Sequence, residues 1–141
     1  MARIKLDYPD AAYTYSTTMT VRTSDLNGNH LGFDAVVSLV GNARNLFLRH
    51  HDIDEHGTPG VIVADLAVTY SAEAFLHDEL RFDAGVVDRN TYGGDIVYRV
   101  TRPADGTLIA TAKTGIVFFD YATKRVTAAP PAFTALFGDE G

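Results

Sequence analysis

Two carboxylates, one imidazole and two amides lie within residues 25–34: Asp25, Asn27, Asn29, His30 and Asp34. A carboxylate can attack a carbonyl carbon or take a proton from water, and a nearby imidazole can orient or protonate a group in the same site. The same stretch is rich in Asn, Gly and Asp, which favour turns and loops. The sequence therefore predicts a loop that carries the side chains of a hydrolytic site.

A helix is expected directly after this loop. Apolar residues recur at spacings of three and four from residue 36 to 47, which predicts one continuously buried helix face. We expect the helix to begin at Asp34, which could cap it, and to end near His51. Because the first turn of a helix presents unpaired backbone N–H groups, it could polarise a carbonyl oxygen held by the loop.

The rest of the chain favours strands. Residues 15–21, 61–70, 80–87, 96–101 and 108–119 are rich in β-branched and aromatic side chains, with turn residues at Asn90, Gly93-Gly94 and Asp105-Gly106. Residues 128–137 are expected to pack as a short tail. One long central helix wrapped by a five-stranded antiparallel sheet is an α+β fold, and we expect residues 1–141 to form a single domain. Residues 61–68 are apolar on both faces, which predicts a homodimer or a homotetramer.

Composition excludes several classes of function. The formal net charge of −6 argues against binding to nucleic acid or to an anionic membrane. With no cysteine, the chain has no thiolate nucleophile and no cysteine-based zinc site. The histidines near His50 and His56 show no recognised metal-ligand spacing, so no metal site is expected. Neither a signal peptide nor a membrane-spanning run is evident, and a cytoplasmic protein is expected.

The segment from Asp25 to Asp34 resembles the active-site loop of a known family. It is similar to the 4-hydroxybenzoyl-CoA thioesterase-like branch of the hotdog superfamily, whose common form reads Asp-x-Asp-x-x-Gly-His-x-Asn-Asn before a central helix. The likeness covers nearly the whole chain, and it also rests on Asn42-Ala43-Arg44, Val68-Thr69-Tyr70, Ala112-Lys113-Thr114-Gly115 and Val117-Phe118-Phe119-Asp120. By position, Asp25 matches the catalytic carboxylate of that family and His30 its histidine. This sequence departs from the pattern at Asn27 and at Gly32-Phe33, and it adds the acid Asp34.

The resemblance implies a hotdog fold and an acyl-CoA thioesterase, an enzyme that hydrolyses the thioester of CoA or of an acyl carrier. CoA would be part of the substrate, and no separate cofactor is expected. The predicted catalytic residues are Asp25, His30 and Asp34. The predicted substrate-binding residues are Asn27, Asn29, Gly32, Asp65, Arg89 and Thr91, of which Arg89 and Thr91 would contact the phosphates of CoA.

Structural roles compete with these functional ones. Asp25 could end a strand as a turn residue, Asp34 could serve only as a helix cap, and His30 could bond to the loop backbone. For Asp65, a structural or subunit-interface role is favoured, because a charge inside an apolar run needs a partner. Two other functions stay open: a hotdog dehydratase or hydratase, and a protein that binds an acyl thioester without cleaving it.

Overall fold

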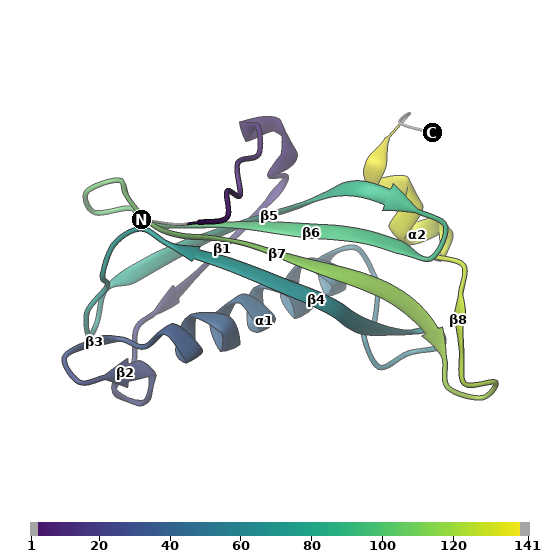
Figure 1. Cartoon of the computed structure of the whole chain (residues 1–141), viewed down its shortest axis with the longest axis horizontal. Coiled ribbons are helices and arrows are strands. Elements are labelled where there is room, and N and C mark those ends of the chain that lie inside the picture. The colour runs from purple at the N-terminus through teal and green to yellow at the C-terminus, as the bar shows by residue number, and fades with distance from the viewer. Residues whose placement is uncertain (1–2, 139–141) are drawn as a thin grey trace.

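The computed structural model describes residues 3–138, which form one curled antiparallel sheet around one long helix (Figure 1). The sheet has the strand order β1-β5-β6-β7-β4, and the short strand β8 pairs with the end of β7. The strands are β1 (Tyr15–Thr20), β4 (Gly60–Tyr70), β5 (Glu79–Asn90), β6 (Gly93–Arg102), β7 (Thr107–Asp120) and β8 (Arg125–Thr127). The α+β fold predicted from the sequence is confirmed.

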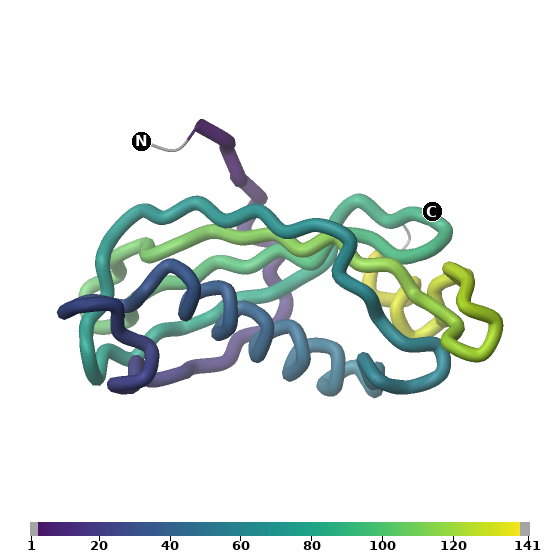
Figure 2. The backbone as a smooth tube through the Cα atoms, turned by 60° about the horizontal axis from the view of Figure 1, so that its bottom comes forward, coloured from purple at the N-terminus to yellow at the C-terminus, as the bar shows by residue number. Residues whose placement is uncertain are grey.

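Helix α1 (Phe33–His50) lies inside the curl of the sheet, as Figure 2 shows from a second direction. Its buried face consists of the apolar residues spaced by three and four: Val36, Leu39, Val40, Ala43, Phe47 and Leu48. Alternate side chains of β5, β6 and β7 pack against this face, among them Phe82, Tyr98 and Phe118, which are all at most 1% exposed. The helix and the concave face of the sheet therefore share one core.

Short elements close the two ends of the sheet. At one end, η2 (Thr23–Asp25), β2 (Leu26–Asn27) and β3 (His30–Leu31) lead into α1. At the other, α2 (Pro131–Thr134) and η3 (Ala135–Phe137) bury Phe133 and Phe137. The prediction that the tail packs against the core is confirmed. A further short helix, η1 (Asp10–Ala12), precedes β1.

Two local predictions are wrong. The N-cap of α1 is Gly32, and Asp34 lies within the first turn and does not cap the helix. Gly93 and Gly94 belong to β6, and the chain reverses at residues 91–92. A side chain at Gly93 would lie 2.0 Å from the carbonyl oxygen of Ile116, so this glycine permits a close approach of two strands.

We expect Phe47→Ala to lower the free energy of unfolding by about 3–5 kcal/mol, because removing a fully buried ring leaves a cavity in a close-packed core. Chemical denaturation would measure the change. Leu46→Ala is the matched control, since Leu46 precedes Phe47 in the helix but is 39% exposed. Equal losses for the two variants would contradict the description of this core.

Candidate active site

The loop predicted from the sequence is a small hairpin that feeds into the helix. Strands β2 and β3 pair Leu26 with Leu31 and Asn27 with His30. Gly28 makes the turn with a φ of +69°, a conformation that few residues other than glycine adopt readily. Asn27 and Asn29 are exposed on this hairpin. The structure thus places the two amides and His30 just before the first turn of α1.

Asp25 is buried and held by Arg22. The guanidinium of Arg22 donates from Nη2 to Oδ1 at 2.9 Å and from Nε to Oδ2 at 3.1 Å, and the backbone N–H of Arg22 donates to Oδ2 at 2.8 Å. These hydrogen bonds lower the pKa of the Asp25 carboxyl below its ordinary value of 3.8, although burial alone would raise it. The backbone oxygen of Asp25 also accepts a hydrogen bond from Gly32 at 2.9 Å. Asp25 therefore fixes the hairpin to the helix start.

Asp34 differs from Asp25 in that its side chain is exposed. A Cβ atom at Gly32 would lie 2.7 Å from Oδ1 of Asp34, so the carboxylate folds back over the N-cap. Gly32 has no side chain to accept a hydrogen bond from the first-turn N–H groups, and no side-chain cap is formed. An accessible carboxylate thus lies beside uncapped backbone donors.

His30 is half-buried, and its ring has a defined orientation. Nδ1 lies 2.9 Å from the carbonyl oxygen of Leu31. Because a carbonyl oxygen can only accept, Nδ1 carries the proton in this contact. The neutral ring then presents Nε2 as an acceptor, so His30 could take up a proton or return one.

Two aromatic residues that were not predicted as site residues lie at this helix start. Tyr70, the last residue of β4, donates from its hydroxyl to the carbonyl oxygen of Phe33 at 3.1 Å, and the two ring centroids are 4.5 Å apart. Burial and then the negative charge of Asp34 raise the pKa of the Tyr70 hydroxyl. Together with the ring of Phe33, which is 62% exposed, Tyr70 gives the site an apolar border.

Asp65 lies apart from this group, in the middle of β4. Its Oδ1 accepts hydrogen bonds from Lys113 Nζ at 2.8 Å and from the N–H of Gly115 at 2.9 Å. The bond from Lys113 is the main reason that the pKa of the Asp65 carboxyl is lowered. Asp65 thus has a partner within the sheet, as the structural alternative anticipated.

Arg89 and Thr91 lie at the opposite end of the sheet from the hairpin. Arg89 is near the end of β5, and Thr91 is in the turn to β6. The beginning of β5 adjoins the hairpin end, so at about 3.3 Å per residue some 30 Å separates Arg89 from that end. Figure 1 shows β2 and β3 on the left and the β5–β6 turn on the right. Within one chain, the structure does not bring these two residues to Asp34.

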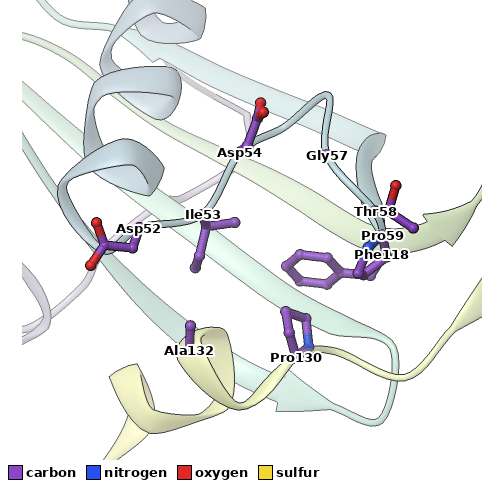
Figure 3. Close-up of a pocket in the computed structure, with 9 residues that line it drawn as sticks. All are labelled: Asp52, Ile53, Asp54, Gly57, Thr58, Pro59, Phe118, Pro130 and Ala132. Atoms are coloured by element: carbon purple, nitrogen blue, oxygen red, sulfur yellow. The ribbon is translucent and has the colours of Figure 1, made fainter.

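Two pockets flank the helix. One, of about 360 Å³, lies beside Arg22 and is also lined by Met19, Thr20, Leu39 and Asn42. The other, of about 230 Å³, lies beyond the C-terminal end of α1 (Figure 3). Its lining consists of Asp52, Ile53, Asp54, Gly57, Thr58, Pro59, Phe118, Pro130 and Ala132. Of these two, only the first is lined by a residue that contacts a candidate catalytic group, since Arg22 binds Asp25.

Residues 3–138 contain no cluster of three or more His, Asp or Glu side chains that could hold a metal ion. In the same part of the chain, no helix combines the length and apolar character needed to cross a membrane.

Comparison with known proteins gives the family. The model of the thioesterase-like superfamily matches residues 21–137, which include the hairpin, α1 and all strands of the sheet except β1. The chain belongs to this superfamily. A search of curated protein sequences found no match.

Solved structures show the same fold. The thioesterase-like chain is similar to a hypothetical protein from Staphylococcus aureus in complex with CoA, with 20% identity, a TM-score of 0.79 and coverage of 86% of this chain and 80% of the other. It is also similar to a 1,4-dihydroxy-2-naphthoyl-CoA thioesterase from Synechocystis, with 14% identity, a TM-score of 0.80 and coverage of 89% of this chain and 96% of the other. A third structure, a thioesterase superfamily protein from Jannaschia, has 16% identity, a TM-score of 0.82 and coverage of 91% of this chain and 84% of the other. The predicted hotdog fold and the resemblance read from the sequence are confirmed.

Sequence reasoning on this thioesterase-like chain found the hairpin but missed Arg22 and Tyr70. Arg22 lies three residues before Asp25, a spacing that could have indicated an ion pair. Tyr70 was part of the family likeness, but its place at the site was not predicted, because its contact with Phe33 joins residues that are 37 positions apart. The structure also shows that the two carboxylates differ: Asp25 is buried and hydrogen-bonded to Arg22, whereas Asp34 is exposed.

The Arg22–Asp25 pair predicts a pH-dependent loss of stability. Because the folded pKa of Asp25 is depressed, its contribution is present above the ordinary value of 3.8 and is lost as pH falls through the folded value. We expect Asp25→Asn to lower the free energy of unfolding at pH 7 by about 1–2 kcal/mol. The expected loss is modest because Arg22 is exposed, and solvent weakens its attraction to Asp25.

Urea unfolding of wild type and variant between pH 2 and pH 7 checks this, and the difference between them should shrink below pH 4. Asp10→Asn, at a carboxylate with 93% side-chain exposure, should be nearly neutral throughout. A difference for Asp25→Asn that stays constant over the whole range would contradict the assignment.

Proposed function

We propose that this chain hydrolyses an acyl thioester of CoA or of an acyl carrier. The observation that carries the proposal is the accessible Asp34 carboxylate beside the uncapped first turn of α1, in a member of the thioesterase-like superfamily. The thioester oxygen would accept hydrogen bonds from the first-turn N–H groups, which would stabilise the charge that develops on it. The pocket of about 360 Å³ beside Arg22, on the β1 side of α1, would take the acyl group.

Asp34 is the carboxylate that acts in this proposal. Asp25 is only 5% exposed, and both of its oxygens accept hydrogen bonds from Arg22, which weakens it as a nucleophile or base. Asp34 has two chemical routes. It could attack the carbonyl carbon, forming an anhydride and releasing the thiolate, after which water would cleave the anhydride. Alternatively, it could take a proton from water, whose oxygen would attack while the carbon–sulfur bond breaks. In either route Nε2 of His30 would first take up the proton that the attacking water releases and would then pass it to the thiolate.

The remaining predicted residues have supporting roles in the proposal. Asn27 and Asn29 would contact the substrate from the hairpin. Gly32 leaves the space that Asp34 occupies above the helix start. Asp25 would position the loop.

Thiol release from short, long and aromatic acyl-CoAs tests the reaction. We expect Asp34→Asn to lower kcat by about 10²- to 10⁴-fold, because the variant loses its base or nucleophile. Asp120→Asn is the control, since Asp120 lies at the far end of the sheet and Asn keeps an oxygen for its bond to the N–H of Ala122. All variants would first be verified as folded by circular dichroism.

Wild-type activity that survives in Asp34→Asn would remove Asp34 from the mechanism. No release across the panel, with a thioester that still raises the melting temperature, would favour the binding protein. Product analysis that finds water added across a double bond, with the thioester intact, would instead favour the hydratase.

We further propose that the chain acts as a homodimer through β4. This strand is an edge of the sheet, and Val63, Leu66 and Tyr70 on it are each about 40% exposed. Two β4 strands paired antiparallel would join two sheets and cover these side chains. Gly60 lies at the sheet end that carries Arg89 and Thr91, and Tyr70 lies beside Asp34. The pairing would therefore bring the Arg89 end of one protomer toward the Asp34 side of the other, where CoA phosphates could be bound.

Sedimentation velocity tests the assembly. We expect the wild type to sediment as a dimer or a larger even assembly, and Leu66→Glu to shift it toward the monomer, because a charge at the interface has no partner. Val126→Glu on β8, at a residue of similar exposure, should not change the assembly. A monomeric wild type at micromolar concentrations would rule out the dimer.

A further inference from the structure

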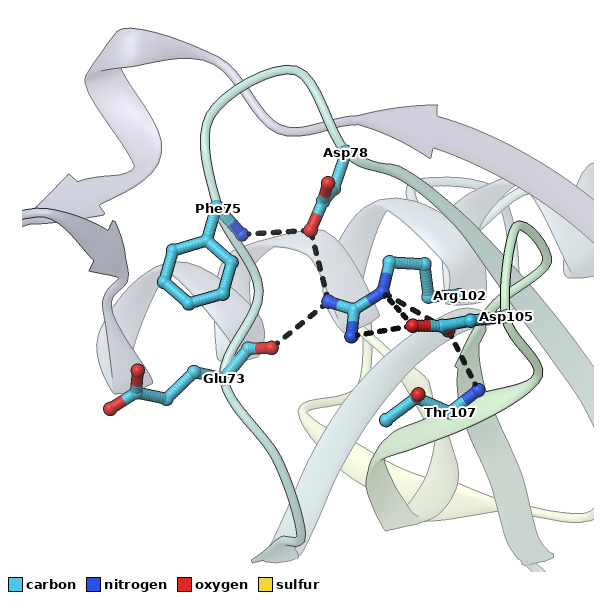
Figure 4. A network of polar contacts seen from close by, with 6 residues as sticks. All are labelled: Glu73, Phe75, Asp78, Arg102, Asp105 and Thr107. Carbon is cyan, nitrogen blue, oxygen red and sulfur yellow. Dashed lines mark hydrogen bonds and ion pairs between the residues drawn. The ribbon is translucent and has the colours of Figure 1, made fainter.

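Arg102, the last residue of β6, is the centre of a polar network outside the candidate site (Figure 4). Its side chain is only 17% exposed. Nη1 donates to the carbonyl oxygen of Glu73 at 3.1 Å and to Oδ2 of Asp78 at 3.0 Å. On its other side, Nε and Nη2 donate to the carboxylate of Asp105 at 3.1–3.2 Å. One guanidinium thus ties the β6–β7 turn to residues 71–78, which connect β4 to β5.

Residues 71–78, here called the connecting loop, make few contacts with one another. Most of their side chains are exposed, and Ala74 is the one fully buried residue among them. Inside the loop, Asp78 closes a short ring: its Oδ2 accepts from the N–H of Phe75 at 3.0 Å, and its own N–H donates to the Phe75 carbonyl at 3.0 Å. Oδ2 of Asp78 is the same atom that Arg102 binds. Arg102 therefore holds the loop at the ring that shapes it.

The connecting loop in turn holds both ends of the candidate site. The N–H of Leu31 donates to the carbonyl oxygen of Ala74 at 2.8 Å. On the other side, the N–H of Val21 donates to the carbonyl oxygen of Asp78, and the N–H of His77 donates to the carbonyl oxygen of Val21, each at 2.9 Å. Val21 immediately precedes Arg22, and Leu31 lies between His30 and Gly32. The loop is therefore bonded to Val21, which precedes η2 and the hairpin, and to Leu31, the last residue of the hairpin.

From this chain of contacts we infer that Arg102 is a positioning residue for the active site, acting through the connecting loop on Leu31 and Val21. This inference rests on the proposed thioester hydrolysis for its effect on rate. Arg102 touches none of the proposed reacting groups. It fixes the position of the Ala74 carbonyl oxygen, which accepts a hydrogen bond from the N–H of Leu31. The carbonyl oxygen of Leu31 in turn accepts the ring proton of His30.

The geometry of the guanidinium explains why an arginine is required. Its planar fork donates in several fixed directions at once, here to a backbone oxygen and to two carboxylates that belong to different turns. A lysine has one nitrogen at the end of a flexible stem, so it could neutralise Asp78 or Asp105 but not span all three acceptors. Arg102→Lys should therefore keep the charge and lose the bridge.

Two measurements test the inference. Amide hydrogen exchange would follow the N–H groups of Leu31 and Val21, and steady-state kinetics would separate kcat from KM. We expect Arg102→Gln to speed exchange at both amides by at least about tenfold and to lower kcat by about tenfold with little change in KM. The reason is that small misplacements of catalytic groups reduce the rate of the chemical step. Arg102→Lys should fall between Arg102→Gln and the wild type.

Arg99→Gln is the matched control. Arg99 lies three residues earlier in β6 and is also paired with two aspartates, Asp10 and Asp83, but these lie away from the connecting loop. Its loss should leave exchange at Leu31 and kcat at wild-type values.

A folded Arg102→Gln variant with wild-type exchange at Leu31 and Val21 would overturn the inference. So would a general loss of stability that Arg99→Gln reproduces with the same fall in kcat. If the wild type cleaves no thioester, the proposed function fails, while exchange at the two amides still decides whether Arg102 positions the hairpin.

Discussion

The need to bury one face of a single helix governs the structure. Helix α1 carries its apolar residues on one side, and residues 3–138 contain no second long helix that could cover it. The sheet must therefore curl until three strands cover it, and Phe47 and Tyr98 become fully buried between the two. The first turn of the helix emerges at the open end of the curl. Burial of the helix body thus fixes the place where its unpaired backbone donors reach solvent.

At that open end, two negatively charged side chains lie near the positive end of the helix dipole. The N-terminus of a helix attracts negative charge, and two carboxylates lie within its reach. One of them, Asp25, is neutralised by Arg22 and used to anchor the hairpin, which leaves Asp34 as the accessible negative group. A glycine at the N-cap keeps the backbone donors open where serine or threonine would satisfy one of them. The local sequence thus leaves the helix start without the stabilisation that a side-chain cap would provide.

The elements of this fold were largely predictable from the sequence, because periodicity and turn chemistry are local. The spacing of Val36, Leu39 and Phe47 predicted the helix, and the β-branched runs predicted the five long strands. The errors arose where distant parts of the chain meet. Gly93 was interpreted as a turn residue because its close approach to Ile116 depends on the register of two strands.

The candidate site also has features that local sequence predicts and features that depend on distant contacts. The hairpin residues were found because they are close in sequence, and the resemblance to a family drew attention to them. The unequal environments of Asp25 and Asp34 could not be predicted, since they depend on burial and on the orientation of the Arg22 side chain. Tyr70 and Arg102 were missed because they reach this end of the molecule only through the pairing of β4 and β6 with β7.

The bulge in β4 has a consequence for solubility. The register shifts between Val63 and Asp65, and Asp65 places a carboxylate, 60% exposed, in the middle of the edge strand. A long, flat and apolar edge would accept any extended chain and grow into open-ended aggregates. Here the kink and the charge divide the edge into two short stretches. A strand from another molecule can pair with β4 only if it matches this irregularity. While β4 is unpaired, its edge therefore disfavours pairing with misfolded chains.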